Sequence, residues 1–328
     1  MKPPRSKTKK YINKDMPVAE KLYNAKILLF GEYGIIKDSM GLSIPYDFYK
    51  GALVFSENMT PEMQKSNESI GDFCAWLKDL NGKEFFKSHI DTDRLENDIE
   101  NGLYFDSSIP LGYGVGSSGA LVAAVYERYA DNPASPAEVS PQDIIALKET
   151  LGHMESFFHG HSSGLDPLIC YMNLPILIRS RHDIGTVGIP NSKKDGKGAI
   201  FLLDSGMSHS TGSLIDIFFE KMKNEGFRKM LKDEFGALND ACIEAFINGR
   251  KASLLENVKM LSLVVLKHFY PMIPRGVRRA WVNGLRTGEY YLKLCGAGGG
   301  GFILGFTDDY EKAARTLREY STQPIYRF

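Results

Sequence analysis

A glycine-rich segment, "PLGYGVGSSGA" at residues 110–120, constrains this chain more than any other stretch. It contains glycines at positions 112, 114, 116 and 119 and serines at 117 and 118, and the helix-forming run "GALVAAVYERYA" continues from it. The loop is therefore expected at a helix N-terminus, where free N–H groups and the positive end of the helix dipole attract anions. Glycine lets the backbone approach phosphate oxygens closely, and serine supplies a neutral oxygen ligand for Mg²⁺.

Three interpretations of this loop compete: a dinucleotide-binding turn, a cradle for nucleotide phosphates, and a turn without a ligand. Gly114, Gly116 and Gly119 satisfy G-x-G-x-x-G literally. A dinucleotide fold also needs a strand soon after the helix, but "DNPASPAEVSPQ" and a second helix follow here. The P-loop motif needs a lysine after its last glycine, and none is present. The sequence favours nucleotide phosphates and leaves the other two interpretations open.

Composition limits the expected partners. The 328 residues include 40 basic and 40 acidic side chains, so neither nucleic acid nor an anionic membrane is expected to bind. No apolar run approaches the roughly 18 residues of a membrane span. Residues 1–20 are basic and are expected to form a solvated, flexible tail, with a polyanion-binding arm as the alternative. The scattered cysteines favour a reducing, cytoplasmic location over a disulfide framework: Cys74, Cys170, Cys242 and Cys295.

The order of apolar and polar segments predicts two α+β domains. Strand, turn and strand are expected at 26–36, another strand at 52–57, and a helix from the N-cap Ser140 to Gly160. The turn "HSSGLDP" then leads to "LICYMNLPILIRS", which is interpreted as strand-like. An exposed segment at 191–198 separates the expected domains 21–190 and 191–328, and the second domain is mainly helical after residue 212.

Phosphoryl transfer needs a metal, charge compensation and a group that orients the acceptor hydroxyl. Glu155 lies on the expected helix, Asp166 follows eleven positions later in the turn, and Lys26 begins the first strand. A lysine close to Asp166 would stabilise negative charge developing on the acceptor oxygen. Each residue also has a plain interpretation: a solvated helix face for Glu155, a turn before a proline for Asp166, and an exposed strand end for Lys26.

Two further patterns are ambiguous on their own. His153, His159 and His161 raise a zinc alternative, but they lack the H-E-x-x-H arrangement. The second glycine run, "CGAGGGGF" at 295–302, lies between two expected strands, so a dinucleotide turn fails there too. A loop this rich in glycine either packs against another backbone or lines a ligand.

Three segments in order resemble the GHMP kinases, the superfamily of galactose, homoserine, mevalonate and phosphomevalonate kinases. They are "KILLFGEYGII", "PLGYGVGSSGALVAA" and "KLCGAGGGGFIL", and with "HGHSSGLDP" they span Lys26 to Gly301. The middle one is similar to P-x-G-x-G-L-G-S-S-A-A, with valine for leucine and Gly119 for the first alanine. Mevalonate kinases look most similar, because their G-K-V-I-L-x-G-E-H is similar to 25–33 and their E…H-G-x-P-S-G-x-D is similar to 155–166, with the same spacing of eleven from glutamate to aspartate.

This resemblance implies an α+β fold with an N-terminal α/β domain and a ferredoxin-like C-terminal domain, and with ATP and substrate bound between them. It implies Asp166 as the catalytic carboxylate, Lys26 as its partner, and Ser118 and Glu155 as ligands of Mg²⁺. The implied ATP-binding residues are Pro110, Gly112, Gly114, Val115, Gly116, Ser117, Ser118 and Gly119. The implied substrate-binding residues are Glu32, Tyr33, Ser163, Thr211, Gly296, Ala297 and Gly298, with Thr211 lying in "DSGMSHSTGSL", which resembles the family's T-G-x-x-R-S-T.

The expected activity is ATP- and Mg²⁺-dependent phosphorylation of a small-molecule alcohol, with mevalonate first, which would serve isoprenoid precursor synthesis. Three departures weaken the assignment of the acceptor: "YNAK" replaces A-P-G-K, Tyr33 replaces a histidine that contacts substrate, and His209 replaces an arginine. Arg179 and Arg181 are available to a phosphorylated substrate, although exposed strand-end charges are the simpler interpretation. The alternatives are a phosphomevalonate or sugar kinase, a dinucleotide oxidoreductase and an ATP-binding regulatory protein; a homodimer is one option for the assembly.

Overall fold

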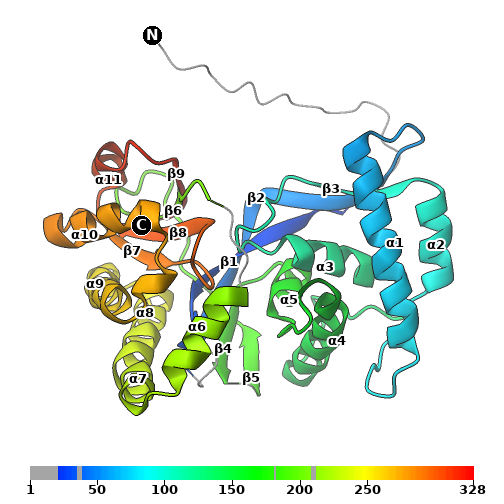
Figure 1. Cartoon of the computed structure of the whole chain (residues 1–328), viewed down its shortest axis with the longest axis horizontal. Coiled ribbons are helices and arrows are strands. Elements are labelled where there is room, and N and C mark those ends of the chain that lie inside the picture. The colour runs from blue at the N-terminus through cyan, green and yellow to red at the C-terminus, as the bar shows by residue number, and fades with distance from the viewer. Residues whose placement is uncertain (1–20, 35–38, 181, 208–211) are drawn as a thin grey trace, which may run out of the picture.

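The computed structural model of the chain describes residues 21–34, 39–180, 182–207 and 212–328. Helices α1–α5 lie toward one end of the molecule and α7–α11 toward the other, with strands β1 and β2 between them (Figure 1). The predicted tail at residues 1–20 lies outside the described residues. Within the described residues, no helix is long and apolar enough to cross a membrane.

The N-terminal half contains an antiparallel sheet with the order β1-β2-β4-β5, in which β3 also pairs with β2. The long strand β2 has three neighbours: it pairs with β1 over most of its length, from Leu42 to Gly51, with β4 at its start and with β3 at its end. The strand bounds are β1 Tyr23–Phe30, β2 Gly41–Phe55, β3 Leu103–Ser107, β4 Ile176–Ser180 and β5 Asp183–Thr186.

Helices α3 and α5 pack together and against β1. Helix α3 is buried along most of its length, and α4 carries the predicted Ser140 N-cap, with a capping box, and ends at Gly160 as predicted. The helix bounds of this half are α1 Pro61–Asn81, α2 Thr92–Glu100, α3 Ser117–Tyr129, α4 Pro141–His159 and α5 Leu165–Met172.

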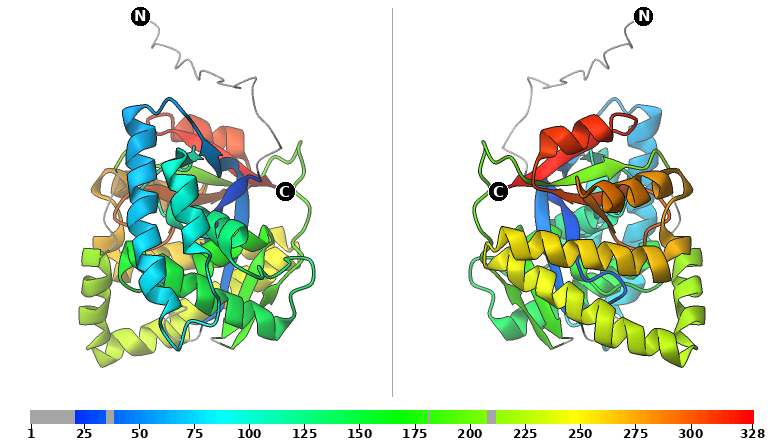
Figure 2. Two further views of the ribbon diagram at one scale, coloured as in Figure 1. Left: turned by 90° about the vertical axis from the view of Figure 1, so that its right-hand side faces the viewer. Right: turned by 90° about the vertical axis from the view of Figure 1, so that its left-hand side faces the viewer.

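The C-terminal half contains a second antiparallel sheet with the order β7-β8-β6-β9. Taken along the chain, this order is that of the ferredoxin-like fold, so the predicted fold class is confirmed. Helices α8 and α9 lie side by side over this half (Figure 2). The bounds are β6 Ala199–Asp204, α6 Gly212–Met222, α7 Glu225–Met230, α8 Ala237–Ile247, α9 Lys251–His268, α10 Arg278–Thr287, β7 Tyr291–Leu294, β8 Phe302–Thr307, α11 Tyr310–Thr316 and β9 Thr322–Arg327.

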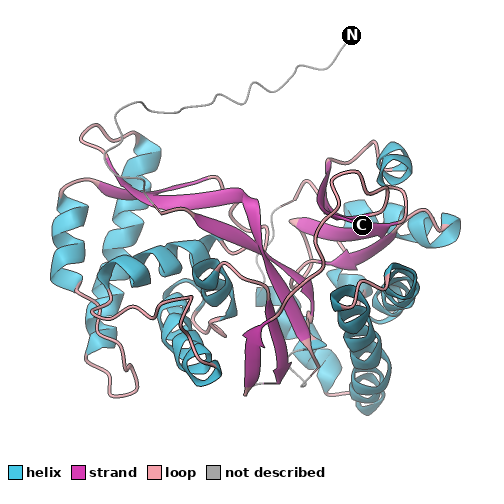
Figure 3. Cartoon of the chain, turned by 180° about the vertical axis from the view of Figure 1, so that it is seen from behind, coloured by secondary structure: helices cyan, strands magenta, loops and turns pink. Residues whose placement is uncertain are grey.

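The two halves share one apolar core. Helix α8 contacts β1 and β2 of the first sheet, and the rings of Phe30 on β1 and Phe306 on β8 lie 5.6 Å apart. The view from behind shows the strands of the first sheet running between the two groups of helices (Figure 3). Strand β1, which begins the first predicted motif, therefore lies where both halves can contribute side chains.

Two local expectations were wrong. The segment predicted as strand-like from residue 168 is helical as far as Met172, and only its second part forms β4. A short apolar run does not distinguish a buried helix from a strand, and here the left-handed residues Gly164 and Asn173 bound the helix at its two ends. Residues 52–55, expected as a separate strand, are the end of β2, and β9 was not predicted.

Candidate active site

The first glycine loop connects β3 to α3 and ends at Gly116, the N-cap residue of that helix. Gly116 has a φ of 81°, in the left-handed region, and a Cβ there would lie 2.8 Å from Cγ of Lys26. The first backbone N–H to pair within the helix is that of Ala120, which donates to the Gly116 carbonyl. The N–H groups of Ser117, Ser118 and Gly119 precede it and have no partner within the helix. The loop therefore has the anion-attracting form that the sequence predicts.

Helix α5 begins directly against this loop. A Cβ at Gly119 would lie 2.8 Å from the backbone of Asp166 and Pro167, so only glycine allows the approach. Asp166 itself lies in the first turn of α5 rather than in the turn before it. Two helix N-termini, those of α3 and α5, therefore meet at one place.

Lys26 and Asp166 form an ion pair at this place, with 2.8 Å between Nζ and Oδ1. The Lys26 side chain is 6% exposed, whereas the Asp166 side chain is 38% exposed. The backbone N–H of Lys26 donates to the Val115 carbonyl, which ties β1 to the glycine loop. Burial alone would lower the pKa of Lys26, but the Asp166 carboxylate outweighs it and holds this pKa above its ordinary value. The exposed-strand-end interpretation of Lys26 is wrong.

Glu155, on α4, is also buried here, so its interpretation as a solvated helix face is wrong. Ser118 Oγ donates to Glu155 Oε1 over 2.9 Å, and Ser162 Oγ donates to Oε2. His159 Nε2 lies 3.0 Å from the same Ser118 hydroxyl. Ser118 and Glu155, predicted as a pair of metal ligands, are therefore in direct contact.

The environment of Glu155 favours a cation. Burial raises the pKa of its carboxyl to about 7, and repulsion from Asp166 adds to the shift, against the hydrogen bonds from Ser162 and Ser118. The carboxylates of Glu155 and Asp166 and the hydroxyls of Ser118 and Ser162 thus lie near one another, and the Lys26 ammonium pairs with Asp166. This all-oxygen donor set fits Mg²⁺, which takes one or two protein carboxylates and completes its shell with phosphate and water oxygens.

The second glycine loop, residues 295–301 between β7 and β8, lies against the first. A Cβ at Gly301 would lie 2.8 Å from Cα of Tyr113, and a Cβ at Gly298 would lie 2.5 Å from the Met272 carbonyl. Gly296 has no atom within 4 Å of such a Cβ. Gly298 and Gly301 therefore allow close packing, whereas Gly296 borders open space.

Tyr33 connects β1 to this second loop. Its hydroxyl donates to the Ala297 carbonyl over 2.6 Å, and its ring packs on Phe218 and Phe269. Its φ of 57° is unusual for a bulky residue and requires a surrounding structure that holds it. Tyr33 and Ala297, both predicted to bind substrate, are thus brought together.

Glu32, also predicted to bind substrate, is held away from solvent. Its carboxylate pairs with the ammonium of Lys293, and the two side chains are 4% and 2% exposed. Lys293 also donates to the Leu294 carbonyl and lies over the Phe30 ring. The prediction for Glu32 did not anticipate this pair, because Lys293 lies 261 positions away in the sequence.

Other predicted residues are less central. Pro110 and Gly112 belong to the first loop, and Ser163 is exposed beside α5. Thr211, His209 and Arg181 lie outside the described residues. Arg179 is 53% exposed and pairs with Asp183, as its simpler interpretation predicts.

The zinc alternative finds no support in the described part of the chain, where no group of three or more histidines, cysteines or acidic residues is placed to hold a metal. The ring of His153 instead packs at a tilt against that of Phe85, with 4.7 Å between the ring centroids. Sequence reasoning missed Ser162, although its position two residues before Gly164, whose N–H it accepts, is a local signal of a serine turn.

No protein-family model matches this chain, and no curated protein matches it in sequence. Solved structures do match it. Mevalonate kinase of Methanococcus jannaschii is 16% identical, with a TM-score of 0.60 over 94% of this chain and 99% of its own. Phosphomevalonate kinase of Streptococcus pneumoniae, in complex with phosphomevalonate and AMPPNP, is 14% identical, with a TM-score of 0.62 over 95% and 99%. Galactokinase of Lactococcus lactis, complexed with galactose, is 10% identical, with a TM-score of 0.58 over 93% and 92%.

These similarities extend over nearly the whole length of each chain, so they concern the complete two-part architecture. The fold is that of a class of small-molecule kinases built from an N-terminal α/β half and a ferredoxin-like half. In particular, the chain has the fold of the GHMP kinases, which its sequence motifs resemble.

Proposed function

We propose that this protein is an ATP- and Mg²⁺-dependent kinase that transfers the γ-phosphoryl group to the hydroxyl of a small alcohol, with mevalonate as the acceptor. One observation carries the proposal: the Lys26–Asp166 ion pair lies beside the Ser118–Glu155 contact at the N-terminus of α3. An acid–base group, a cation, metal-binding oxygens and an anion-binding helix end are the parts that phosphoryl transfer requires.

Asp166 is the partly exposed member of the ion pair, so an acceptor hydroxyl can reach its carboxylate. In the proposed reaction Asp166 orients this hydroxyl and accepts its proton as the oxygen attacks the γ-phosphorus of ATP, and the bond from that phosphorus to the β-phosphate oxygen breaks to release ADP. The Lys26 ammonium, held 2.8 Å from Asp166 Oδ1, offsets the negative charge that develops on the attacking oxygen. Lys26 stays protonated throughout, in accord with its raised pKa.

The phosphate groups of ATP fit the first glycine loop, where the N–H groups that open α3 can donate to their oxygens. Ser118 and Glu155 would hold Mg²⁺, which offsets the charge of the phosphates when it is bound. Ser162 keeps the Glu155 carboxylate turned toward Ser118 by its own hydrogen bond.

For the acceptor, the resemblance to mevalonate kinases is joined by one structural observation. Arg179 is one of the two cations, with Arg181, that the sequence offers to a phosphorylated acceptor, and it lies at an exposed strand end in a pair with Asp183. Its position removes one argument for phosphomevalonate, which remains the second candidate because a phosphomevalonate kinase has the same fold.

A panel of acceptors tests the proposal: mevalonate, phosphomevalonate, homoserine and galactose, each with ATP and Mg²⁺ and with ADP release measured by a coupled assay. We expect the highest kcat/KM with mevalonate. A higher value with phosphomevalonate or galactose would reassign the acceptor but keep the reaction. Stabilisation by ATP·Mg²⁺ in a thermal-shift assay without turnover on any acceptor would favour a regulatory protein, and stabilisation by NAD⁺ alone would favour an oxidoreductase.

A further inference from the structure

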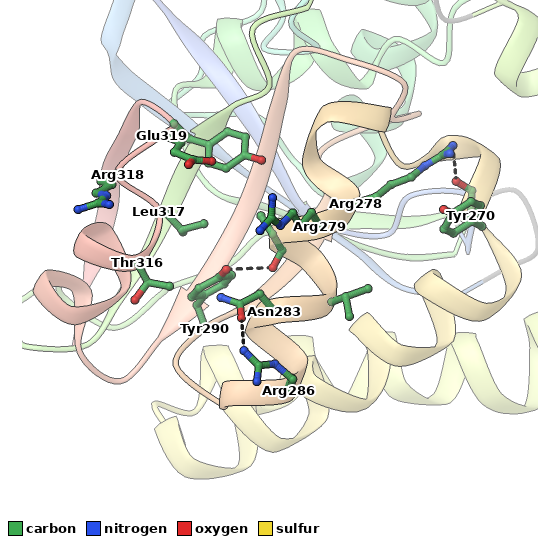
Figure 4. A pocket seen from close by; sticks show the side chains of 13 residues that line it. Tyr270, Arg278, Arg279, Asn283, Arg286, Tyr290, Thr316, Leu317, Arg318 and Glu319 are labelled. Atoms are coloured by element: carbon green, nitrogen blue, oxygen red, sulfur yellow. Dashed lines mark hydrogen bonds between the residues drawn. The ribbon is translucent and has the colours of Figure 1, made fainter.

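A cavity of about 720 Å³ lies in the C-terminal half, between α10 and the segment that follows α11. Its lining includes no residue of β1, of either glycine loop or of α5, so it is separate from the candidate active site. Figure 4 shows Arg279 and Arg286 on α10, with Arg286 reaching Asn283, and Arg318 on the opposite segment, where its side chain lies at the outer edge of the cavity. The volume lies in the range of small-molecule sites, roughly 300–1,000 Å³.

The charge of the lining is strongly one-sided. Four arginines and a single acid, Glu319, line the cavity, which gives a formal charge of +3 in a chain whose net charge is zero. Within the described residues none of these arginines forms an ion pair with a carboxylate; the ion-paired arginines there are Arg128, Arg179 and Arg327. The cavity thus gathers positive charge that the described protein does not neutralise.

The arginines also break a rule of helix design. Arg278 and Arg279 are the first two residues of α10, at the positive end of its dipole, and its first turn contains no acidic residue. A helix of this kind normally starts with acids, so the placement is locally unfavourable. Such a violation is expected where a bound group compensates for it.

The arginines that line the cavity differ in their contacts with the rest of the protein. Arg279, Val282, Asn283 and Arg286 recur at helical spacing and form the α10 face toward the cavity, while Trp281 and Gly284 on the other face are buried. Arg278 instead donates to the carbonyls of Ile273 and Tyr270 and stacks on the Tyr270 ring at 4.1 Å. Arg278 therefore maintains the wall. Arg286 donates one N–H to Asn283 Oδ1 over 2.9 Å, and its other N–H groups remain for a ligand together with Arg279 and, at the rim, Arg318.

We propose that this cavity binds a small polyanion with two or more linked phosphate groups. Guanidinium groups bind phosphate oxygens through paired, charge-assisted hydrogen bonds, and arginines on both sides of a cavity suit a ligand whose charges are spread over several atoms. The cavity is concave and the chain carries no net positive charge, so a small molecule fits better than an extended nucleic acid.

Calorimetric titration with inorganic tripolyphosphate tests this proposal in the full chain. We expect binding that weakens with added salt, and a roughly tenfold to hundredfold loss of affinity in the R279Q/R318Q variant, because two charge-assisted contacts are removed. A control variant, K65Q/R250Q, removes two exposed positive charges outside the cavity and should keep the affinity within about twofold. Arg278 is left intact because its loss would disturb the wall.

The phosphate loop of the candidate active site is the main competitor for the probe, so S118A is titrated in parallel. Loss of binding in S118A with full binding in R279Q/R318Q would place the anion in that loop and overturn the proposal. The same holds if the unaltered protein does not bind tripolyphosphate, or if orthophosphate binds equally well. Tighter, arginine-dependent binding of a duplex oligonucleotide would replace the small ligand with nucleic acid. None of these outcomes depends on whether the protein phosphorylates mevalonate.

Discussion

Among the described residues, two buried lysines, Lys26 and Lys293, each pair with a carboxylate, and the two pairs differ in the exposure of that carboxylate. In Lys26–Asp166 the lysine is 6% exposed and the carboxylate 38%, whereas in Lys293–Glu32 the values are 2% and 4%. Both lysines lie on strands, one on β1 and one on β7, and both pairs involve the β1 region. The first pair presents a carboxylate to solvent at the meeting of two helix N-termini, and the second is sealed between the two halves. A ligand can reach the Asp166 carboxylate but not that of Glu32. We therefore expect the first pair to serve the proposed reaction and the second to hold the two halves of the molecule together.

Replacing Asp166 with asparagine should produce the largest effect. The amide keeps the size of the side chain but cannot accept the hydroxyl proton, so we expect kcat to fall by roughly 10²–10⁴-fold. ATP affinity should change little, because Asp166 is not part of the glycine loop. Coupled ADP assays and nucleotide titration measure the two quantities. Unchanged turnover in D166N would remove Asp166 from the chemistry.

Replacing Lys293 with methionine should affect stability instead. The substitution leaves the Glu32 carboxylate buried and unpaired, and breaking a buried pair costs about 3–5 kcal/mol of unfolding free energy. The double variant K293M/E32Q also removes the unpaired negative charge of Glu32, so it should recover a large part of the lost unfolding free energy. Urea unfolding measures both variants. If K293M were as stable as the unaltered protein while kcat fell as in D166N, the proposed division of labour between the pairs would be wrong.

Glu155 is a third case to compare with the two lysine–carboxylate pairs. Its carboxylate is buried, but its hydrogen-bond partners are the serines Ser118 and Ser162 rather than a lysine. Its pKa of about 7 in the folded state exceeds its ordinary value of 4.5, so the folded protein binds the proton more tightly than the unfolded chain. Without metal, the stabilisation that Glu155 contributes should therefore be fully present below about pH 4.5, be lost as the pH rises from 4.5 to about 7, and be absent above that. A shift of this size corresponds to a loss of roughly 3–3.5 kcal/mol.

Unfolding curves at a series of pH values, with E155Q as the control, measure this dependence. E155Q should lack the decline between pH 4.5 and 7 that Glu155 causes. Mg²⁺ with a non-hydrolysable ATP analogue should restore stability above pH 7, because it favours the charged carboxylate. A decline of equal size in E155Q would assign it to other groups.

Features that depend on neighbouring residues could be predicted from the sequence, whereas contacts between residues far apart in the sequence could not. The glycine loop, the start of α3 and the end of α4 depend on neighbouring residues, and the sequence predicted them. The contact of Ser118 with Glu155 followed from a family resemblance, not from local pattern, because 37 positions separate them. Helix α5 was missed because an apolar run is compatible with either structure. Lys293 was missed because its role depends on a partner in the other half of the chain.

The smallest expected effect is that of Tyr33→Phe. This variant tests whether the region of the buried Lys293–Glu32 pair influences the site of the partly exposed Lys26–Asp166 pair. Tyr33 follows Glu32 directly, and its hydroxyl bonds the Ala297 carbonyl of the second glycine loop. Losing one neutral hydrogen bond costs about 1 kcal/mol, so we expect KM for the acceptor to rise about fivefold with kcat within about twofold.

Tyr46→Phe is the matched control, because the buried Tyr46 hydroxyl has no hydrogen-bond partner among the described residues and its removal should leave KM unchanged. If the two variants have equal kinetics, the Tyr33–Ala297 bond does not shape the acceptor site. If Tyr33→Phe alone raises KM, the second glycine loop belongs to that site, and the Glu32–Lys293 pair, whose members lie next to Tyr33 and just before the loop in sequence, supports it.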